Sequence, residues 1–182
     1  EETGAIEAIG AWVIQQACAT AAHWPSSVKV CLNVSAQQLR SAALCELVAK
    51  SLAQAGLSAD RLEIEITESV LIGDEHAAHD ILTSLRNSGV RLALDDFGTG
   101  YSSLGYLRRL PFDRIKIDRS FVTGVVTDPG SVAIVKSIIG LAADLGMDCI
   151  AEGIETPEQL AALRRLGCPE IQGYLIGKPM AA

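Results

Sequence analysis

The feature that most constrains the fold of this chain is a strict alternation of short β-rich runs with longer stretches of helical periodicity. Apolar residues recur at helical spacing in the segments that separate the runs. The predicted strands span residues 28–34, 61–67, 90–96, 113–118, 147–153 and 170–176; the predicted helices span 5–22, 41–55, 75–88, 129–145 and 157–166, with a helical turn near 102–109. Because parallel strands need crossover connections, this order predicts a parallel sheet with helices outside it.

Residues at the predicted helix ends agree with this division. Asp128 and Thr156 each precede a proline, which places an N-cap before a first-turn proline. Thr156 and Gln159 have the spacing of a capping box. The glycines that directly follow predicted helix ends are Gly56, Gly89 and Gly146.

Length and composition limit the class of protein. With 182 residues and 49% hydrophobic content, the chain can bury a core, and we expect one domain spanning residues 1–182. A net charge of −7 argues against a nucleic-acid groove binder, so neither DNA nor RNA is expected as a partner. The five scattered cysteines suit reduced core thiols.

The hydropathy of the segments indicates where in the cell the chain is located. No segment approaches the roughly 20 apolar residues of a membrane span, and the acidic opening "EETG" is not a signal peptide. We therefore expect a cytoplasmic chain without membrane contact from this segment, either by itself or as the cytoplasmic domain of a larger, membrane-anchored protein.

Every predicted strand carries a polar side chain near its C-terminal end. These side chains belong to Asn33, Glu65, Asp95, Lys116, Glu152 and Gln172. A two-sided α/β sheet is apolar on both faces, whereas barrel enzymes place their chemistry at the C-terminal ends of the strands. The pattern predicts an α/β fold of the (β/α)8 TIM-barrel type, here lacking the first two of its eight strands.

The oxygen atoms in this set favour a hard divalent cation. The carboxylates of Glu65, Asp95, Asp96 and Glu152, with the amide oxygen of Asn33, suit Mg²⁺, Mn²⁺ or Ca²⁺ rather than zinc. Adjacent aspartates would repel each other, which is tolerable if Asp95 bridges two cations and Asp96 helps to hold the second. Two such ions can activate water and stabilise a leaving oxygen in phosphoryl chemistry.

Each of these residues also has a purely structural interpretation. Asp95 and Asp96 before a glycine loop could form a turn or a helix cap, and Asn33 could cap the following helix. Glu65 could be an ordinary strand carboxylate, and Lys116 could simply pair with an acidic neighbour. Their co-occurrence at the ends of separate strands favours a site.

Six motifs of the chain together resemble one known family. They are "LNVSAQQL", "EIEITES", "LALDDFGTGYSSL", "DRIKIDRSFV", "IAEGIET" and "QGYLIGKP". Their order and spacing are similar to those of the EAL-domain family, phosphodiesterases that hydrolyse cyclic di-GMP to linear pGpG in bacterial second-messenger signalling. The resemblance implies a (β/α)8 barrel, two Mg²⁺ or Mn²⁺ ions per site and a homodimer. The alternative is a catalytically inactive cyclic di-GMP receptor or protein-interaction module.

The resemblance also assigns metal ligands. Asn33, Glu65 and Asp95 match ligands of the first metal, with Asp95 bridging to the second metal and Asp96 binding it.

Further roles come from the same resemblance. Lys116 matches a lysine that contacts the catalytic water and phosphate, and Glu152 a carboxylate that orients water. Gln172 matches a polar, substrate-binding residue at the rim of the site. Glu68 matches a glutamate that anchors the loop 96–104, which couples metal binding to dimer contacts.

One departure from the family concerns its signature strand. The Glu-Ala-Leu strand that names the family is absent, since "EETG" lies after that strand in the family. A metal-ligating glutamate and several substrate contacts are expected to be absent with it, so we expect the chain to be a fragment of the full domain.

Overall fold

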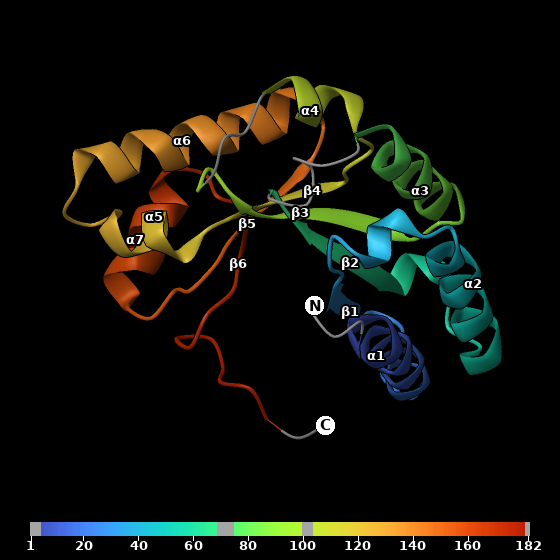
Figure 1. Cartoon of the computed structure of the whole chain (residues 1–182). Coiled ribbons are helices and arrows are strands. Elements are labelled where there is room, and N and C mark those ends of the chain that lie inside the picture. Colours follow the sequence, from blue (N-terminus) through green and yellow to red (C-terminus); the bar gives the residue numbers. More distant parts are fainter. Residues whose placement is uncertain (1–4, 69–74, 100–103, 181–182) are drawn as a thin grey trace. The chain divides into compact units, whose positions relative to one another are not determined.

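We describe the fold from a computed structural model, in which residues 5–68, 75–99 and 104–180 are placed well enough to describe. The strands are β1 (Val30–Asn33), β2 (Leu62–Thr67), β3 (Arg91–Phe97), β4 (Arg114–Ile117), β5 (Asp148–Ala151) and β6 (Glu170–Ile171). The α-helices are α1 (Ala5–Ala21), α2 (Ala43–Ala55), α3 (Glu75–Asn87), α4 (Leu104–Arg109), α5 (Arg119–Gly124), α6 (Pro129–Asp144) and α7 (Pro157–Arg165). Two short 3-10 turns are η1 (Gln38–Arg40) and η2 (Ala59–Arg61) (Figure 1).

The predicted order of elements is confirmed, with two differences. The last strand ends at Ile171 rather than at residue 176, because the chain turns after Gln172 and the amide of Ile176 donates to the carbonyl of Gly173. Helix α5 was not predicted. It has only six residues, too few to show a helical period, and it begins at a cap supplied by Asp118.

The predicted helix caps are also confirmed. Thr156 and Gln159 form a capping box at the start of α7, and the Asp128 side chain accepts hydrogen bonds from two backbone amides of α6. The predicted glycines all have left-handed φ values, which only glycine adopts without strain. These values are 64° for Gly56, 93° for Gly89 and 70° for Gly146.

The described contacts divide the chain into two compact units, with the boundary inside β3. The first unit contains residues 1–93 and 103–112. In it β1 pairs in parallel with β2, and α1 packs against α2 (Figure 1). Strand β1 alternates buried Val30 and Leu32 with exposed Cys31 and Asn33, whereas β2 is buried along almost its whole length.

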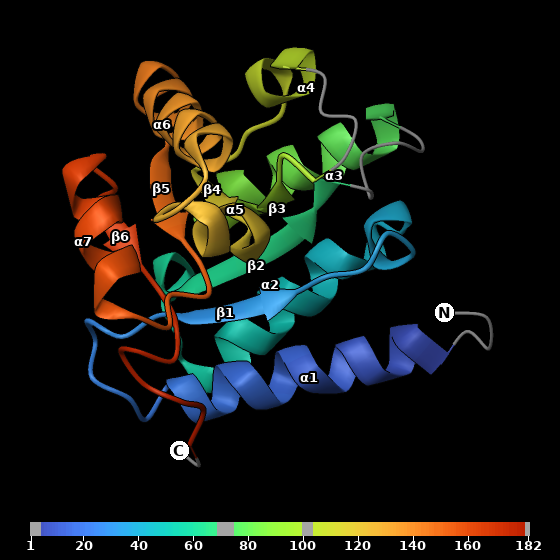
Figure 2. The same ribbon diagram turned by 90° about the vertical axis from the view of Figure 1, so that its left-hand side faces the viewer.

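The second unit contains residues 94–102 and 113–182. Its strands are the last part of β3, then β4, β5 and β6 in sheet order, and the β4–β5 and β5–β6 pairs are parallel. Helix α6 packs on β4, β5 and α5 (Figure 2). All four β4 residues are buried, as expected for a parallel strand covered on both faces.

Parallel strands joined by helical crossovers confirm the predicted fold class, the (β/α)8 type with six of its strands present. No helix in the described part of the chain is both long enough and apolar enough to cross a membrane.

Candidate functional site

Strand register places two predicted metal ligands beside each other in the first unit. The parallel β1–β2 pair aligns Asn33 with Glu65, both near the C-terminal ends of their strands. The amide of Val34 donates to the carbonyl of Glu65 at 3.0 Å, which continues the ladder by one residue. Asn33 is exposed and Glu65 is buried. An amide oxygen and a carboxylate are thus presented together at this end of the pair.

The same register brings together a second acidic group. Ligand atoms of Cys31, Glu63 and Glu65 lie within 4.8 Å of one another. Glu63 is buried and forms an ion pair with Arg91, whose Nε lies 3.3 Å from its Oε2. Because Arg91 neutralises Glu63, this carboxylate supports the strand pair, while Glu65 lies two residue pairs nearer the strand ends. Sequence reasoning assigned no role to Cys31 or Glu63, although their alternation with apolar residues placed them on the same face.

In the second unit, Lys116 joins two of the predicted residues. Its Nζ lies 3.0 Å from Oδ1 of Asp95 and 2.7 Å from Oε1 of Glu152. The Lys116 side chain is only 5% exposed. A buried ammonium group is stable only when it is paired, and here two carboxylates from neighbouring strands hold it in one position. The ends of β3, β4 and β5 thus converge on one charged cluster.

Asp96 adds a second carboxylate at the end of β3. Among the described residues other than glycine, Asp96 has a left-handed backbone, with a φ of 54°. Its amide donates a hydrogen bond to Oδ1 of Asp95 at 3.0 Å. Burial raises the pKa of Asp96, and the negative charges of Asp95 and Asp118 raise it further, while Lys116 lowers it. Asp96 is therefore held where its own charge is disfavoured, as expected of a group that binds a cation.

Asp118 completes this cluster. Its side chain caps α5 by accepting from the amide of Ser120, and a hydrogen bond joins it to the carboxyl of Asp96. Burial alone would raise the pKa of Asp118, but hydrogen bonds from the Ser120 hydroxyl and from the amides of Ser120 and Arg119 hold it below the usual range. Four carboxyl groups thus surround the ammonium group of Lys116 in this part of the second unit: those of Asp95, Asp96, Asp118 and Glu152.

Two further predicted residues lie near these strand ends. Gln172 is exposed just after β6; its amide donates to Ala151 at 2.8 Å, and its carbonyl accepts from Ile154 at 3.1 Å. Gly173 follows, and a Cβ there would lie 2.2 Å from the backbone of Ile154, so only glycine permits this approach. In the first unit, Glu68 is buried directly after β2.

The structure tests several of the purely structural roles that the sequence left open for these residues. Asn33 caps no helix, because η1 begins at Gln38 with Gln37 at its N-cap position. Asp96 does lie in a turn, since its carbonyl accepts from the amide and hydroxyl of Thr99. Lys116 does pair with acidic neighbours, and those neighbours are themselves predicted site residues. Residues 100–103 of the predicted loop lie outside the described part of the chain.

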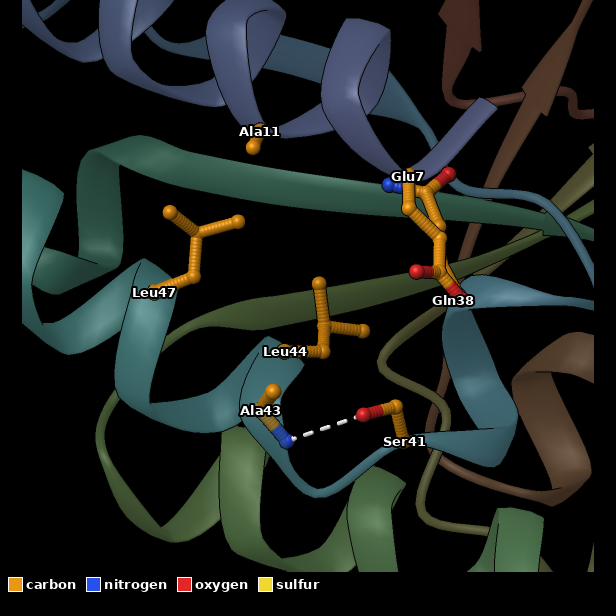
Figure 3. Close-up of a pocket in the computed structure, with 7 residues that line it drawn as sticks. All are labelled: Glu7, Ala11, Gln38, Ser41, Ala43, Leu44 and Leu47. Atoms are coloured by element: carbon orange, nitrogen blue, oxygen red, sulfur yellow. Dashed lines mark hydrogen bonds between the residues drawn. The ribbon is translucent and has the colours of Figure 1, made fainter. Parts of the chain in front are cut away.

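A pocket in the first unit is separate from all of these residues. It lies between α1 and the segment from η1 to α2 (Figure 3). Its lining residues are Glu7, Ala11, Gln38, Ser41, Ala43, Leu44 and Leu47. The Ser41 hydroxyl accepts from the amide of Ala43, and Gln38 accepts from the amide and hydroxyl of Ser35. These polar groups serve local turns, so the pocket carries none of the predicted chemistry.

The donor set fits a divalent cation. In the second unit Asp95, Asp96 and Glu152 provide only oxygen ligands and an excess of negative charge around Lys116. In the first unit Asn33 and Glu65 provide oxygen atoms as well. Oxygen-only donors suit Mg²⁺, Mn²⁺ or Ca²⁺. Fold and residues together define a class: a parallel α/β protein of the (β/α)8 type with acidic groups at the C-terminal ends of its strands.

Comparison with known proteins narrows this class to a family. The family model of the EAL domain matches residues 1–179, and the chain therefore belongs to the EAL-domain family. The cyclic di-GMP phosphodiesterase NbdA of Pseudomonas aeruginosa is 42% identical over 186 residues, covering 99% of this chain and 24% of NbdA. The chain spans about a quarter of the length of the curated relatives it matches first, from 22% to 27%.

Solved structures agree with this assignment. The PaMucR phosphodiesterase in complex with cyclic di-GMP superimposes with a TM-score of 0.95 at 41% identity, over 100% of this chain and 75% of that chain. A Klebsiella pneumoniae BlrP1 complex with manganese and cyclic di-GMP superimposes with a TM-score of 0.82 at 34% identity, over 88% of this chain and 42% of that chain. The fold expected from the sequence is thus the fold of solved EAL domains.

Proposed function

We propose that this chain is the partial, single EAL domain of a protein that hydrolyses cyclic di-GMP to linear pGpG. The observation that carries the proposal is the buried Lys116, held between Asp95 and Glu152 at the ends of three strands. This arrangement places a fixed positive charge beside carboxylates that can bind cations. The cyclic di-GMP named for the relatives NbdA and PaMucR supports the choice of substrate.

The proposed cofactor is a pair of Mg²⁺ or Mn²⁺ ions. From the motif match, we propose Asn33, Glu65 and Asp95 as ligands of one ion, with Asp95 and Asp96 binding the other. Manganese in the BlrP1 complex supports a divalent ion of this kind. Bound ions would supply Lewis acidity toward the phosphate oxygens and lower the pKa of a water molecule.

The chain's own residues provide positioning and charge. Lys116, fixed by Asp95 and Glu152, donates hydrogen bonds to a non-bridging phosphate oxygen and to the attacking water, which stabilises negative charge as it develops. Glu152 orients this water in line with the ribose 3′ leaving oxygen and accepts its proton. Gln172 lies at the rim and contacts the substrate. Glu68 anchors the loop 96–104 to the end of β2.

Other properties are proposed from family membership. We propose a homodimer, a cytoplasmic location and no nucleic-acid partner, the last because the net charge is −7. The same location holds if the chain is the cytoplasmic part of a longer, membrane-anchored protein.

The test is hydrolysis of cyclic di-GMP with Mn²⁺, followed by separation of pGpG by chromatography. The chain is compared with a longer protein that includes it and the preceding part of its domain. In the active form, Lys116→Met and Glu152→Gln are each expected to reduce turnover on the order of 10²-fold or more, as removal of a charge-stabilising group commonly does.

Matched controls carry the same substitutions at exposed positions. Lys136→Met and Glu46→Gln lie on helices α6 and α2 and should leave turnover unchanged. Binding of cyclic di-GMP by the longer protein without any cleavage would instead establish the alternative, a receptor. Turnover that survives Glu152→Gln at full rate would exclude the proposed mechanism.

A further inference from the structure

Arg119 lies just beyond β4, next to the loop that carries Glu152 in the second unit. The register of β4 with β5 pairs Ile117 with Ala151, and the amide of Glu152 donates to the carbonyl of Ile117 at 3.1 Å. Two residues beyond that pair in each segment, Arg119 comes to lie beside Gly153. Strand pairing thus brings an arginine side chain against the residue that directly follows Glu152.

The aliphatic stem of Arg119 covers Gly153. A Cβ atom added to Gly153 would lie 2.8 Å from both Cβ and Cδ of Arg119, closer than ordinary van der Waals contact. Gly153 also has a φ of 69°, in the left-handed region that favours glycine. The glycine therefore permits both the turn of the loop and the close approach of the arginine stem.

The guanidinium group of Arg119 holds the same loop at a second point. Its Nη2 lies 2.8 Å from Oε1 of Glu155. The amide of Glu155 in turn donates to the side-chain oxygen of Gln159 in α7 at 2.8 Å. The side chains of the ion pair are 60% and 40% exposed, so the pair adds little to the stability of the fold. Its main effect is on the geometry of the loop.

Glu152 lies between β5 and these two contacts. Its Oε1 is 2.7 Å from Nζ of Lys116, and its side chain is 20% exposed. Lys116 fixes one oxygen of this carboxylate but not the backbone that carries it. The stem and the guanidinium of Arg119 restrain that backbone at residues 153 and 155. Such contacts, one step away from the reacting groups, keep a catalytic side chain in its working orientation.

We propose that Arg119 is a positioning residue, which holds the loop 152–156 in the geometry in which Glu152 orients the attacking water. The inference rests on the hydrolysis of cyclic di-GMP proposed above. Arg119 contacts Gly153 and Glu155, so its contribution to the reaction passes through Glu152. Because a misplaced catalytic group slows the chemical step, loss of Arg119 should lower kcat and leave KM almost unchanged.

Three substitutions in the active form of the protein separate the parts of the Arg119 side chain. Arg119→Lys keeps the stem and the charge, Arg119→Met keeps the stem alone, and Arg119→Ala removes both. We expect kcat to fall on the order of 10-fold for Arg119→Ala and by less for Arg119→Met. Arg119→Lys should retain most of kcat, because an ammonium group can also contact Oε1 of Glu155. Arg164→Ala, at an exposed arginine of α7, is the matched control and should leave kcat unchanged.

A double-mutant cycle tests whether the charge of Arg119 acts through Glu155. If the ion pair carries the effect, Arg119→Met should not lower kcat further in a Glu155→Gln background. An undiminished loss of kcat in that background would overturn the proposal, because Arg119 would then act through another group. A rise in KM at unchanged kcat would also overturn it, because that result would identify Arg119 as a residue that contacts the substrate.

A measurement without substrate or metal tests the restraint itself. Hydrogen exchange in EDTA, followed by mass spectrometry, reports on the amides of Ile154 and Glu155, each of which donates a hydrogen bond. Arg119→Ala should speed exchange several-fold in peptides from residues 152–156 and leave exchange in α6 unchanged. Exchange at the unsubstituted rate in the loop would show that Arg119 does not restrain it.

The two measurements fail separately from the proposed function. If the unsubstituted protein does not hydrolyse cyclic di-GMP, the proposed function fails, and the exchange rates still decide whether Arg119 holds the loop. If the unsubstituted protein hydrolyses cyclic di-GMP and Arg119→Ala does so at the full rate, the positioning role fails and the proposed function stands. Should Arg119→Ala not fold, as judged by thermal melting, Arg119→Met takes its place in both measurements, since it keeps the stem.

Discussion

At the scale of single residues, Asp96 destabilises the fold in two ways, through its backbone conformation and through its charge. A left-handed backbone costs a non-glycine residue about 1–2 kcal/mol, although aspartate and asparagine tolerate it best. Its charge is disfavoured as well, because burial and the carboxylates of Asp95 and Asp118 raise its pKa. A residue that is unfavourable in both respects is more readily explained by cation binding than by folding.

Asp96→Asn should therefore separate stability from function. Asparagine keeps the backbone conformation and removes the charge, so in EDTA we expect a higher melting temperature than that of the unsubstituted protein. A raised pKa in the folded state imposes its penalty above the folded pKa and none below the unfolded value of 3.8. The difference between the two proteins should thus be present at neutral pH and vanish in strong acid.

The same substitution should abolish most of the hydrolysis, on the order of 10²-fold, in whichever form of the protein is active. Thermal melts across pH and a turnover assay check both expectations. Asp144→Asn, at an exposed position at the end of α6, is the control. A lower melting temperature for Asp96→Asn in EDTA would show that the charge of Asp96 stabilises the fold.

At the scale of elements, the β5–β6 pair depends on the close approach of Gly173, just after β6, to the backbone of Ile154, just after β5. Gly173→Ala should destabilise the protein by about 1–3 kcal/mol or more, because the added methyl group meets the backbone of Ile154 rather than a movable side chain. Gly140→Ala is the matched control inside α6, where nothing lies within 4 Å of the added Cβ. It should stabilise the helix by about 0.5–1 kcal/mol.

Urea denaturation measures both changes, and the two substitutions should shift the midpoint in opposite directions. Equal midpoints for Gly173→Ala and the unsubstituted protein would mean that β5 and the segment after β6 can separate without cost.

Helix α6 supplies a test of pH dependence. Hydrogen bonds from the hydroxyl and amide of Ser131 and from the amide of Gly130 lower the pKa of its cap, Asp128. A lowered folded-state pKa stabilises the protein above the unfolded value of 3.8, and this stabilisation disappears as the pH falls through the folded value.

Asp128→Asn keeps an oxygen at the cap but does not titrate. Its stability should therefore fall less steeply with acid below about pH 4 than that of the unsubstituted protein. Urea midpoints measured between pH 2 and 7 check this, with Asp144→Asn as control. Parallel pH profiles for Asp128→Asn and the unsubstituted protein would contradict it.

At the scale of the whole molecule, cation binding should raise stability by mass action. Four linked carboxyl groups accompany Lys116 in the second unit, and a bound cation relieves their repulsion. A ligand at 100 times its Kd adds about 2.7 kcal/mol. For a chain of this length that corresponds to a rise in Tm of about 5–10 °C.

Melting with Mn²⁺ or Mg²⁺ against EDTA, at matched ionic strength, measures this effect. Asp95→Asn should remove most of the rise, while Asp144→Asn should retain it. A rise of equal size in Asp95→Asn would place the stabilising ion elsewhere in the protein.

The sequence alone determined the order of strands and helices, the caps at Thr156 and Asp128, and the family. Periodicity and capping are local, because each depends on residues a few positions apart. Polar side chains at strand ends were also evident from the sequence, since side chains alternate along a strand. Helix α5 was not, because six residues are too few to show a period.

Only the tertiary structure decided which of these residues meet. Lys116 could have paired with many carboxylates, and the register of β4 with β5 brings it to Glu152, 36 residues away. The left-handed backbone of Asp96 likewise depends on how strands and turns are placed. A sequence fixes each residue's chemistry and its face of a strand, but contacts between distant residues exist only after strands align and water is excluded between them.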